Sequence, residues 1–180
     1  MRILETERLI LRELVMEDAG ALARVISDPE TMRYYPAPFD RGGVEQWIER
    51  NRARYLKDGH GLWGMVLKSC GELIGDCGLI RQEVDGESLV EIGYHVCRDQ
   101  WGKGLAPEAA KACRDYGFTR LGERYLISLI RPENFPSRRV AEKVGMTLWK
   151  TTLWRDLPHC VYRIFRSSDK ARPGLASSSA

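Results

Sequence analysis

The chain has 180 residues, a formal net charge of +3, a hydrophobic fraction of 43% and a charged fraction of 29%. These are the values of an ordinary soluble globule, and they do not support a basic nucleic-acid-binding surface. No apolar run approaches the length of a membrane span, and the acidic N-terminal segment containing Glu5 and Glu7 does not resemble a signal peptide. We therefore expect a cytoplasmic protein with no membrane or nucleic-acid partner.

The length of the chain predicts a single domain over residues 1–166. The five cysteines are odd in number and lack Cys-x-x-Cys or Cys/His spacing, so we expect reduced thiols and no metal site. Residues 167–180 are rich in serine and contain Pro173 and Gly174, a composition typical of a disordered tail.

The N-terminal part predicts one strand and two helices. Alternating apolar residues indicate a strand over 6–14, and an apolar stripe indicates a helix over 18–27. A second helix is expected over 40–59, with Asp40 as a candidate cap. The tyrosine-rich connector between the helices, residues 32–39, either packs against the core or forms the rim of a pocket.

Three strands are expected next, over 62–68, 73–82 and 89–97, joined by short glycine-bearing turns that favour antiparallel hairpins. If Asp85-Gly86 forms a two-residue primed turn, the register places three pairs opposite each other: Ile80 with Glu91, Gly78 with Gly93, and Asp76 with His95. One face of this hairpin is then polar and small-sided, with room for a reacting group between Gly78 and Gly93, beside Glu91.

The C-terminal part predicts a helix over 107–121 closed by Gly122, a strand over 125–130 and a helix over 137–144 capped by Gly145. Strands over 147–155 and 160–165 form a closing hairpin with its turn at 156–159. The expected fold is α+β, with a mixed, mostly antiparallel central sheet flanked by four main helices.

A glycine-rich turn joins the strand ending at Cys97 to the following helix, and it has the sequence Trp101-Gly102-Lys103-Gly104-Leu105-Ala106. Backbone N–H groups of such a turn, together with the helix N-terminus, favour an anion such as a phosphate. A P-loop requires Ser or Thr after the lysine, and a dinucleotide fingerprint requires a third glycine where Pro107 stands. Both nucleotide-binding motifs are therefore disfavoured.

This turn resembles the acyl-CoA pyrophosphate loop of the GNAT superfamily of N-acetyltransferases, and over residues 5–165 the chain is most similar to the Rim-type ribosomal-protein alanine acetyltransferase branch. A second motif runs from Asn134 through Ser137 to Met146 and is similar to the family's Asn-x-x-Ser and Glu-Lys-x-Gly-Phe sequences. The chain departs from the family at Trp101, where Gln or Arg is common, and at Met146, where Phe is usual. By composition alone, Asn134 and Ser137 would be helix caps.

The resemblance implies acetyl-CoA as co-substrate, with no metal, in a ternary complex with an amine. It implies that the pantetheine arm pairs with the backbone of Tyr94, His95 and Val96, and that Asn134 bonds the arm from the other side. It also implies that a backbone N–H near Tyr94 stabilises the oxyanion and that Ser137 protonates the leaving thiolate. The implied pyrophosphate site comprises Trp101, Gly102, Lys103, Gly104, Leu105 and Ala106.

Glu91 is the candidate general base, because a partly desolvated carboxylate with a raised pKa can accept a proton from an ammonium group directly or through a water. The alternatives are a structural Glu91 paired with an arginine, or a base at His95, Asp76 or a water chain. Cys97 lacks an evident His-Asp partnership in the sequence, which disfavours a cysteine nucleophile.

The sequence leaves the class of acceptor open. A peptide or protein N-terminal amine is the first hypothesis, and a small amine such as an aminoglycoside, a polyamine or an amino acid is the second. A non-catalytic acyl-CoA-binding module is the third. The sequence does not distinguish a monomer from a homodimer.

Overall fold

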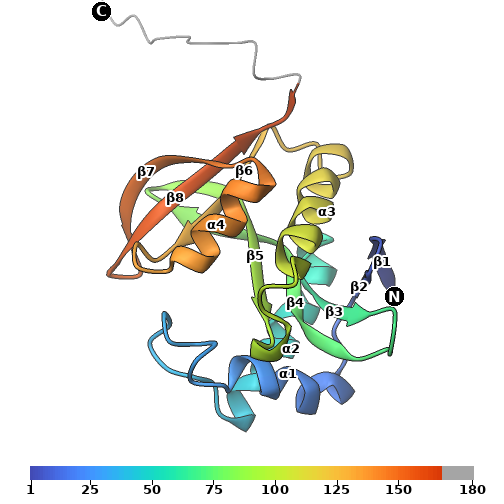
Figure 1. Ribbon diagram of the computed structural model, residues 1–180. Coiled ribbons are helices and arrows are strands. Elements are labelled where there is room, and N and C mark those ends of the chain that lie inside the picture. The colour runs from blue at the N-terminus through green and yellow to red at the C-terminus, as the bar shows by residue number, and fades with distance from the viewer. Residues whose placement is uncertain (168–180) are drawn as a thin grey trace, which may run out of the picture.

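The computed structural model describes residues 1–167, so the predicted tail lies outside the described residues except for Ser167. Eight strands form one sheet in the order β1-β2-β3-β4-β5-β6-β8-β7 (Figure 1). The strands are β1 (Arg2–Glu5), β2 (Leu9–Arg12), β3 (Leu62–Leu67), β4 (Leu73–Val84), β5 (Glu87–Val96), β6 (Tyr125–Ile130), β7 (Thr147–Trp154) and β8 (Leu157–Phe165). The helices are α1 (Ala19–Ile26), α2 (Arg41–Asp58), α3 (Leu105–Thr119) and α4 (Phe135–Val144), with short 3-10 helices η1 (Met16–Asp18) and η2 (Arg98–Gln100).

The sheet is antiparallel except between β5 and β6, which confirms the predicted fold class. These two parallel strands pair at a single position, Glu91 opposite Ile127. Just beyond it, the Ser128 hydroxyl donates to the Ile92 carbonyl at 2.8 Å. Figure 1 shows β5 continuing away from β6 toward α1 and α2. The central sheet therefore opens on the C-terminal side of Glu91.

The β4–β5 hairpin has the predicted register. Asp85 and Gly86 have φ values of 52° and 81°, which are those of a two-residue primed turn. Ile80 lies opposite Glu91, and the Gly78–Gly93 and Asp76–His95 pairs follow with no register shift.

The expected gap between Gly78 and Gly93 is only partly present. A Cβ on Gly78 would collide with the carbonyl oxygen of Gly61, so this glycine permits close approach of the β3 side of the sheet. A Cβ on Gly93 would lie 3.3 Å from Leu62 Cδ2. Open space therefore exists on the Gly93 side, where Leu62 and Gly93 both line a cavity.

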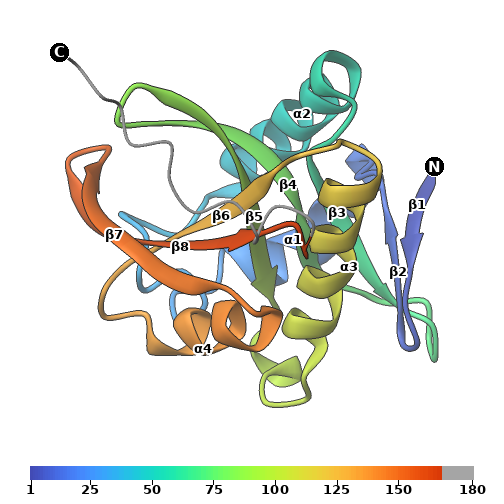
Figure 2. The same ribbon diagram turned by 90° about the horizontal axis from the view of Figure 1, so that it is seen from above.

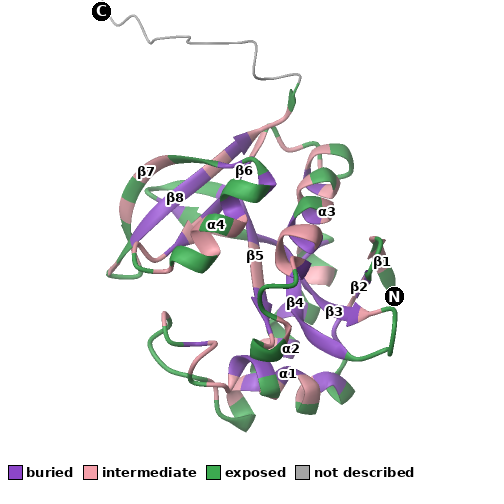
Figure 3. Ribbon diagram, in the orientation of Figure 1, coloured by how far each residue is buried: buried purple, intermediate pink, exposed green. Residues whose placement is uncertain are grey.

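Helices cover both faces of the sheet. Figure 2 shows α2 on one side of β4 and β5 and α3 and α4 on the other. Separate hydrophobic clusters form under the α3–α4 face and the α1–α2 face, and the buried colouring of Figure 3 follows the central strands between them. No helix in residues 1–167 is long and apolar enough to cross a membrane.

Polar caps and left-handed glycines define the ends of α2 and α4, although α4 begins at Phe135 and not at Ser137, so Ser137 lies inside the helix and is not its cap. Asp40 Oδ1 accepts from Gly43 N at 2.7 Å at the start of α2, and Gly59 ends that helix with φ 74°. Asn134 Oδ1 accepts from Ser137 N at 3.2 Å at the start of α4, and Gly145 ends it with φ 93°. These contacts satisfy amide and carbonyl groups that the helix termini leave unpaired.

Several elements differ from the sequence prediction. The strand expected over 6–14 is limited to Leu9–Arg12, because Thr6 turns away to contact α3, and the edge strand β1 was not predicted. The closing turn lies at Arg155 and Asp156, with φ values of 50° and 62°, rather than at 156–159. Pro158 is tolerated within β8 because pairing with β6 begins only at Cys160. Helix α3 also ends at Thr119, before Gly122.

Candidate active site

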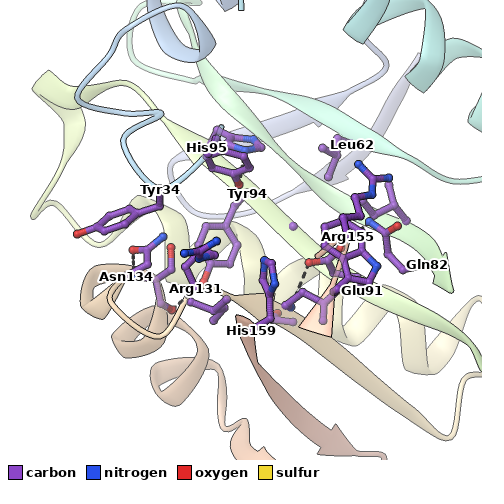
Figure 4. A pocket seen from close by; sticks show the side chains of 18 of the residues that line it. Tyr34, Leu62, Gln82, Glu91, Tyr94, His95, Arg131, Asn134, Arg155 and His159 are labelled. Atoms are coloured by element: carbon purple, nitrogen blue, oxygen red, sulfur yellow. Dashed lines mark hydrogen bonds between the residues drawn. The ribbon is translucent and has the colours of Figure 1, made fainter. Parts of the chain in front are cut away.

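A cavity of about 820 Å³ occupies the opening between β5 and β6. Its walls come from the α1–α2 connector, α2, residues 91–95 of β5, residues 128–131 after the β5–β6 pairing, the start of α4 and the β7–β8 hairpin. The connector that the sequence suggested as a pocket rim lines the cavity, and the β7–β8 hairpin does so too. Figure 4 shows the labelled side chains converging from these separate elements.

Glu91 lies in the wall of this cavity with 8% of its surface exposed. Its Oε2 accepts from Gln82 Nε2 at 2.9 Å, and its Oε1 accepts from the Leu129 backbone N–H at 3.1 Å. No arginine forms an ion pair with Glu91 within residues 1–167. The alternative of a structural Glu91 paired with an arginine is therefore wrong.

Burial raises the pKa of Glu91 above its ordinary value, although the hydrogen bonds from Gln82 and Leu129 and the charges of His95 and Arg155 oppose the shift. A carboxylate whose pKa is raised is a stronger base once ionised. The environment of Glu91 therefore suits proton abstraction.

Tyr94, Asn134 and Ser137 also meet at the cavity wall. The Tyr94 hydroxyl donates to the Ser137 carbonyl at 2.8 Å, which joins β5 to the first turn of α4. Burial raises the pKa of this phenol, so it remains protonated. A hydrogen bond with the Ser137 side chain acts against this shift, so the Ser137 hydroxyl lies beside that of Tyr94 at the cavity wall.

A buried polar chain lies along the opposite wall. His95 Nδ1 is 2.7 Å from Asp76 Oδ1, and His95 Nε2 is 2.8 Å from the Tyr35 hydroxyl. Trp47 Nε1 donates to Asp76 Oδ2 at 2.8 Å. Both ring nitrogens of His95 thus have a protein partner within hydrogen-bond distance. The His95 side chain is therefore held by the protein and is not free to contact the arm of a ligand.

The glycine turn lies at the other end of β5 and does not line the cavity. Gly102 and Gly104 both have φ 77°, a left-handed conformation that glycine adopts without steric cost. The backbone amides of residues 102–106 donate to no acceptor in the described part of the chain. Several unsatisfied N–H groups at a helix start form a site that fits a pyrophosphate.

The N-terminal segment anchors this turn. The Thr6 hydroxyl and the Arg8 amide donate to Glu108 Oε1 at 2.6 and 2.9 Å, and the Arg8 guanidinium pairs with Glu108 Oε2. Arg8 also donates to the Lys103 carbonyl at 2.9 Å. Burial alone would raise the pKa of Glu108, but the bonds from Thr6 and Arg8 lower it. Glu108 is thus held ionised in the first turn of α3, beside the glycine turn.

The open edge of β5 connects the turn to the cavity. Cys97 N donates to Ile74 O on β4, so by strand alternation the amides and carbonyls of Tyr94 and Val96 point to the unpaired side. Trp101 Nε1 donates to the Val96 carbonyl at 2.7 Å. Within residues 1–167, the backbone N–H and carbonyl of Tyr94 and the N–H of Val96 therefore remain unpaired on this edge, where an extended ligand arm could pair with them. The Trp101 side chain is bonded to Val96 and orients the turn.

The predicted site residues therefore fall into two groups. The cavity contains Glu91, Tyr94, His95, Asn134 and Ser137, whereas the turn contains Trp101, Gly102, Lys103, Gly104, Leu105 and Ala106, and Val96 lies between them. Cys97 belongs to neither group. Burial and the neighbouring Asp99 raise the pKa of its thiol to about 11, the opposite of what a nucleophile requires.

Sequence reasoning indicated the tyrosine-rich connector as a possible rim but missed the arginines of the cavity wall and the role of Trp47. Arg50, Arg54 and Arg155 line the cavity from α2 and the β7–β8 turn, and Tyr35 and Trp47 position the Asp76–His95 pair. The four-residue spacing of Arg50 and Arg54 marks one helix face, which is the only sequence signal for this wall. Residues 1–167 hold no group of three His, Cys, Asp or Glu side chains that could bind a metal ion.

Comparisons with known proteins give consistent matches. Residues 8–147 match the family model described as "Acetyltransferase (GNAT) domain". The chain is 38% identical over 160 residues to "Uncharacterized protein YkkB" of Bacillus subtilis (strain 168), covering 88% of this chain and 93% of that one. It is 36% identical over 160 residues to "Uncharacterized N-acetyltransferase p20" of Bacillus licheniformis, covering 87% of each.

A solved structure has the same fold. An acetyltransferase from Agrobacterium tumefaciens str. C58 is 32% identical with a TM-score of 0.81, covering 92% of this chain and 95% of that one. None of these three names mentions a ribosomal-protein acetyltransferase, so the placement in the Rim-type branch stays a prediction.

Proposed function

We propose that this chain, which belongs to the GNAT family of N-acetyltransferases, transfers an acetyl group from acetyl-CoA directly to the N-terminal amine of a peptide or protein. The GNAT fold uses acetyl-CoA. One observation carries the proposal. The buried Glu91 carboxylate, which forms no ion pair in residues 1–167, lies in a cavity on the open edge of β5, and the same strand leads into the turn whose amides, in residues 102–106, have no acceptor in the described part of the chain. A small-molecule amine is the second candidate acceptor, because the cavity volume is typical of small-ligand pockets.

Each part of the chain has a distinct task in this proposal. The amides of residues 102–106 hold the pyrophosphate, and the edge of β5 at Tyr94 and Val96 holds the pantetheine arm by strand-like pairing. Acetyl-CoA supplies the activated thioester. Glu91 accepts the proton of the acceptor ammonium, directly or through a water, which frees the nitrogen lone pair for attack.

The remaining groups stabilise charge as the acyl group moves. The Tyr94 backbone N–H on the open edge stabilises negative charge on the carbonyl oxygen. Asn134 bonds the arm from α4. The Ser137 hydroxyl donates a proton to the leaving thiolate and is reprotonated by the second proton, which the attacking nitrogen loses as the amide forms. No covalent bond to the enzyme is formed, which agrees with the raised pKa of Cys97.

Substitutions of Asn134 and Ser137 separate capping from catalysis. Asn134 caps α4, so Asn134→Ala should cost about 0.5–2 kcal/mol of stability whatever its other role. We expect it in addition to raise the Michaelis constant for acetyl-CoA, and Ser137→Ala to lower turnover, both measured per folded molecule. A loss limited to melting temperature would remove both residues from the mechanism.

Thiol release tests the proposal as a whole. Wild-type protein with acetyl-CoA should release free thiol only when an amine is added, at a rate that saturates with both substrates. Calorimetry should show acetyl-CoA binding without an acceptor. If acetyl-CoA does not bind, the proposed function is wrong.

A further inference from the structure

The acceptor cavity has a strongly cationic wall. Arg50, Arg54, Arg131 and Arg155 line it, against the carboxylates of Asp40 and Glu91. Arg131 pairs with Glu133 at 2.8 Å, and Asp40 caps α2. Arg50, Arg54 and Arg155 form no ion pair with any residue in 1–167. We call these three residues the arginine cluster.

Neighbouring groups hold each member of the arginine cluster. The Arg50 guanidinium lies 5.5 Å from the Trp47 ring centroid, and that of Arg155 lies 4.3 Å from the Trp154 ring centroid. Arg54 Nη1 donates to Asn51 Oδ1 at 3.1 Å. Arg155 also occupies the left-handed region of a tight turn, with φ 50°. The cluster is therefore partly preorganised, which lowers the entropic cost of ligand binding.

The three charges act on one another. Burial lowers the pKa of Arg54, and the like charges of Arg50 and Arg155 lower it further, while Asp58 and Glu91 oppose the shift. Arg155 in turn acts on Glu91. Figure 4 shows Arg155 on the same side of the cavity as Glu91 and Gln82. The cluster lies beside the proposed general base, and its mutual repulsion would be relieved by a bound anion.

The pyrophosphate of acetyl-CoA does not account for the arginine cluster. Glu91 and the end of β5 at Val96 are five residues apart, about 17 Å along an extended strand, and the turn lies beyond Val96. A pyrophosphate held by residues 102–106 is therefore too far away to contact the cluster. The remaining ligand of the cavity is the acceptor.

We infer that Arg50, Arg54 and Arg155 bind an oxyanion, either a carboxylate or a phosphate, that the acceptor carries close to its reacting amine. This inference rests on the proposed function. The planar guanidinium groups match the geometry of carboxylates and phosphates. Polyamines and aminoglycosides, which carry several positive charges, are repelled by the same wall. The favoured acceptors are amino acids, amino phosphates and peptides with an acidic residue at the N-terminus.

Matched acceptor pairs test the inference. Each pair shares its amine and differs in charge: aspartate and asparagine amide, phosphoethanolamine and ethanolamine, and the tripeptide amides Asp-Ala-Ala and Asn-Ala-Ala. The pairs distinguish a free carboxylate, a phosphate and an acidic peptide as the source of the anion. Spermidine serves as the cationic acceptor, and kcat/KM is measured for each.

Two variants make the test independent of intrinsic amine reactivity, because the kcat/KM of each acceptor in the variant is compared with its kcat/KM in the wild type. Arg50→Gln and Arg155→Gln replace exposed side chains, so both proteins should fold. We expect each to lower kcat/KM by about 10-fold or more for the anionic member of at least one pair, and Arg50→Gln to change the neutral member by less than about 2-fold. Arg155→Gln also removes a charge that acts on Glu91, so for this variant the loss on the neutral member should be smaller than the loss on the anionic member. Arg52→Gln is the control, since Arg52 lies on the same helix, pairs with Glu49 and does not line the cavity.

The outcomes separate this inference from the proposed function. Selective loss on the anionic members, with an unchanged KM for acetyl-CoA, supports the oxyanion site. Equal losses on both members, or spermidine as the best acceptor, would overturn it while leaving acetyl transfer intact. Absence of acetyl-CoA binding in the wild type would instead contradict the proposed function.

Discussion

Glu91→Gln is expected to lower turnover by about 10²–10⁴-fold and to leave acetyl-CoA affinity close to that of the wild type. The wild-type rate should rise with pH as Glu91 ionises, at a pH above the ordinary glutamate value because burial raises its pKa. The variant should lack this acidic limb. The pH profile of kcat/KM for the acceptor measures both effects.

The same substitution should not unfold the protein. Its amide oxygen can accept from Leu129 N, and Gln82 can rotate its own amide to present oxygen instead of nitrogen. A carboxyl group whose folded pKa is raised favours the protonated state on folding, so its ionisation destabilises the fold as pH rises from the unfolded pKa through the folded one. The neutral variant avoids that cost, and its melting temperature at neutral pH should equal or exceed that of the wild type.

Near-normal turnover with an unchanged acidic limb would place the base elsewhere. His95 is the next candidate, because it lies on the cavity wall and is linked to Asp76 and Tyr35. His95→Gln would then show the loss expected for Glu91→Gln.

Gly104→Glu is expected to abolish acetyl-CoA binding. The side chain would place a carboxylate among the amides of residues 102–106, where it would repel the phosphates and compete for the same donors. Calorimetry with acetyl-CoA measures the loss directly.

Gly104→Ala is the matched control for this variant. Residue 104 has φ 77°, so any side chain there adds backbone strain of about 1–2 kcal/mol. A Cβ at this position would lie 3.6 Å from Arg8 Nη2, which leaves room for alanine. We expect Gly104→Ala to weaken binding only moderately. Equal affinities in Gly104→Glu and the wild type would exclude the turn as the pyrophosphate site.

Local sequence rules predicted the elements that local chemistry determines. Asp85-Gly86 sets the β4–β5 register, because a two-residue primed turn admits one pairing and all later pairs follow from it. Asp40 was predicted as a cap, and Asn134 was considered as one by composition, for similarly local reasons. The turn predicted at 156–159 included Pro158, which lies within β8. Proline is tolerated in a strand where no neighbouring strand requires an N–H donor at that position, and β6 pairs with β8 only from Cys160 onward.

Local sequence rules do not predict the arginine-lined wall of the cavity. Arg54 and Arg155 are about a hundred residues apart in the sequence, and only the packing of α2 and the β7–β8 hairpin around the open sheet brings them to one cavity. The single pairing of β5 with β6 creates that opening, and no residue pattern in either strand specifies where two parallel strands separate. The site was therefore predicted as a set of motifs, and its geometry required the tertiary structure.

Mass spectrometry of both reaction partners tests direct acetyl transfer most directly. The protein is incubated with acetyl-CoA alone, and then with acetyl-CoA and an acceptor amine. The account predicts an unmodified protein in the first reaction, and an amine heavier by one acetyl group in the second, in equal amount to the thiol released. An acetylated protein that forms without acceptor and passes its acetyl group to the amine, or thiol release with no acetylated amine, would contradict it.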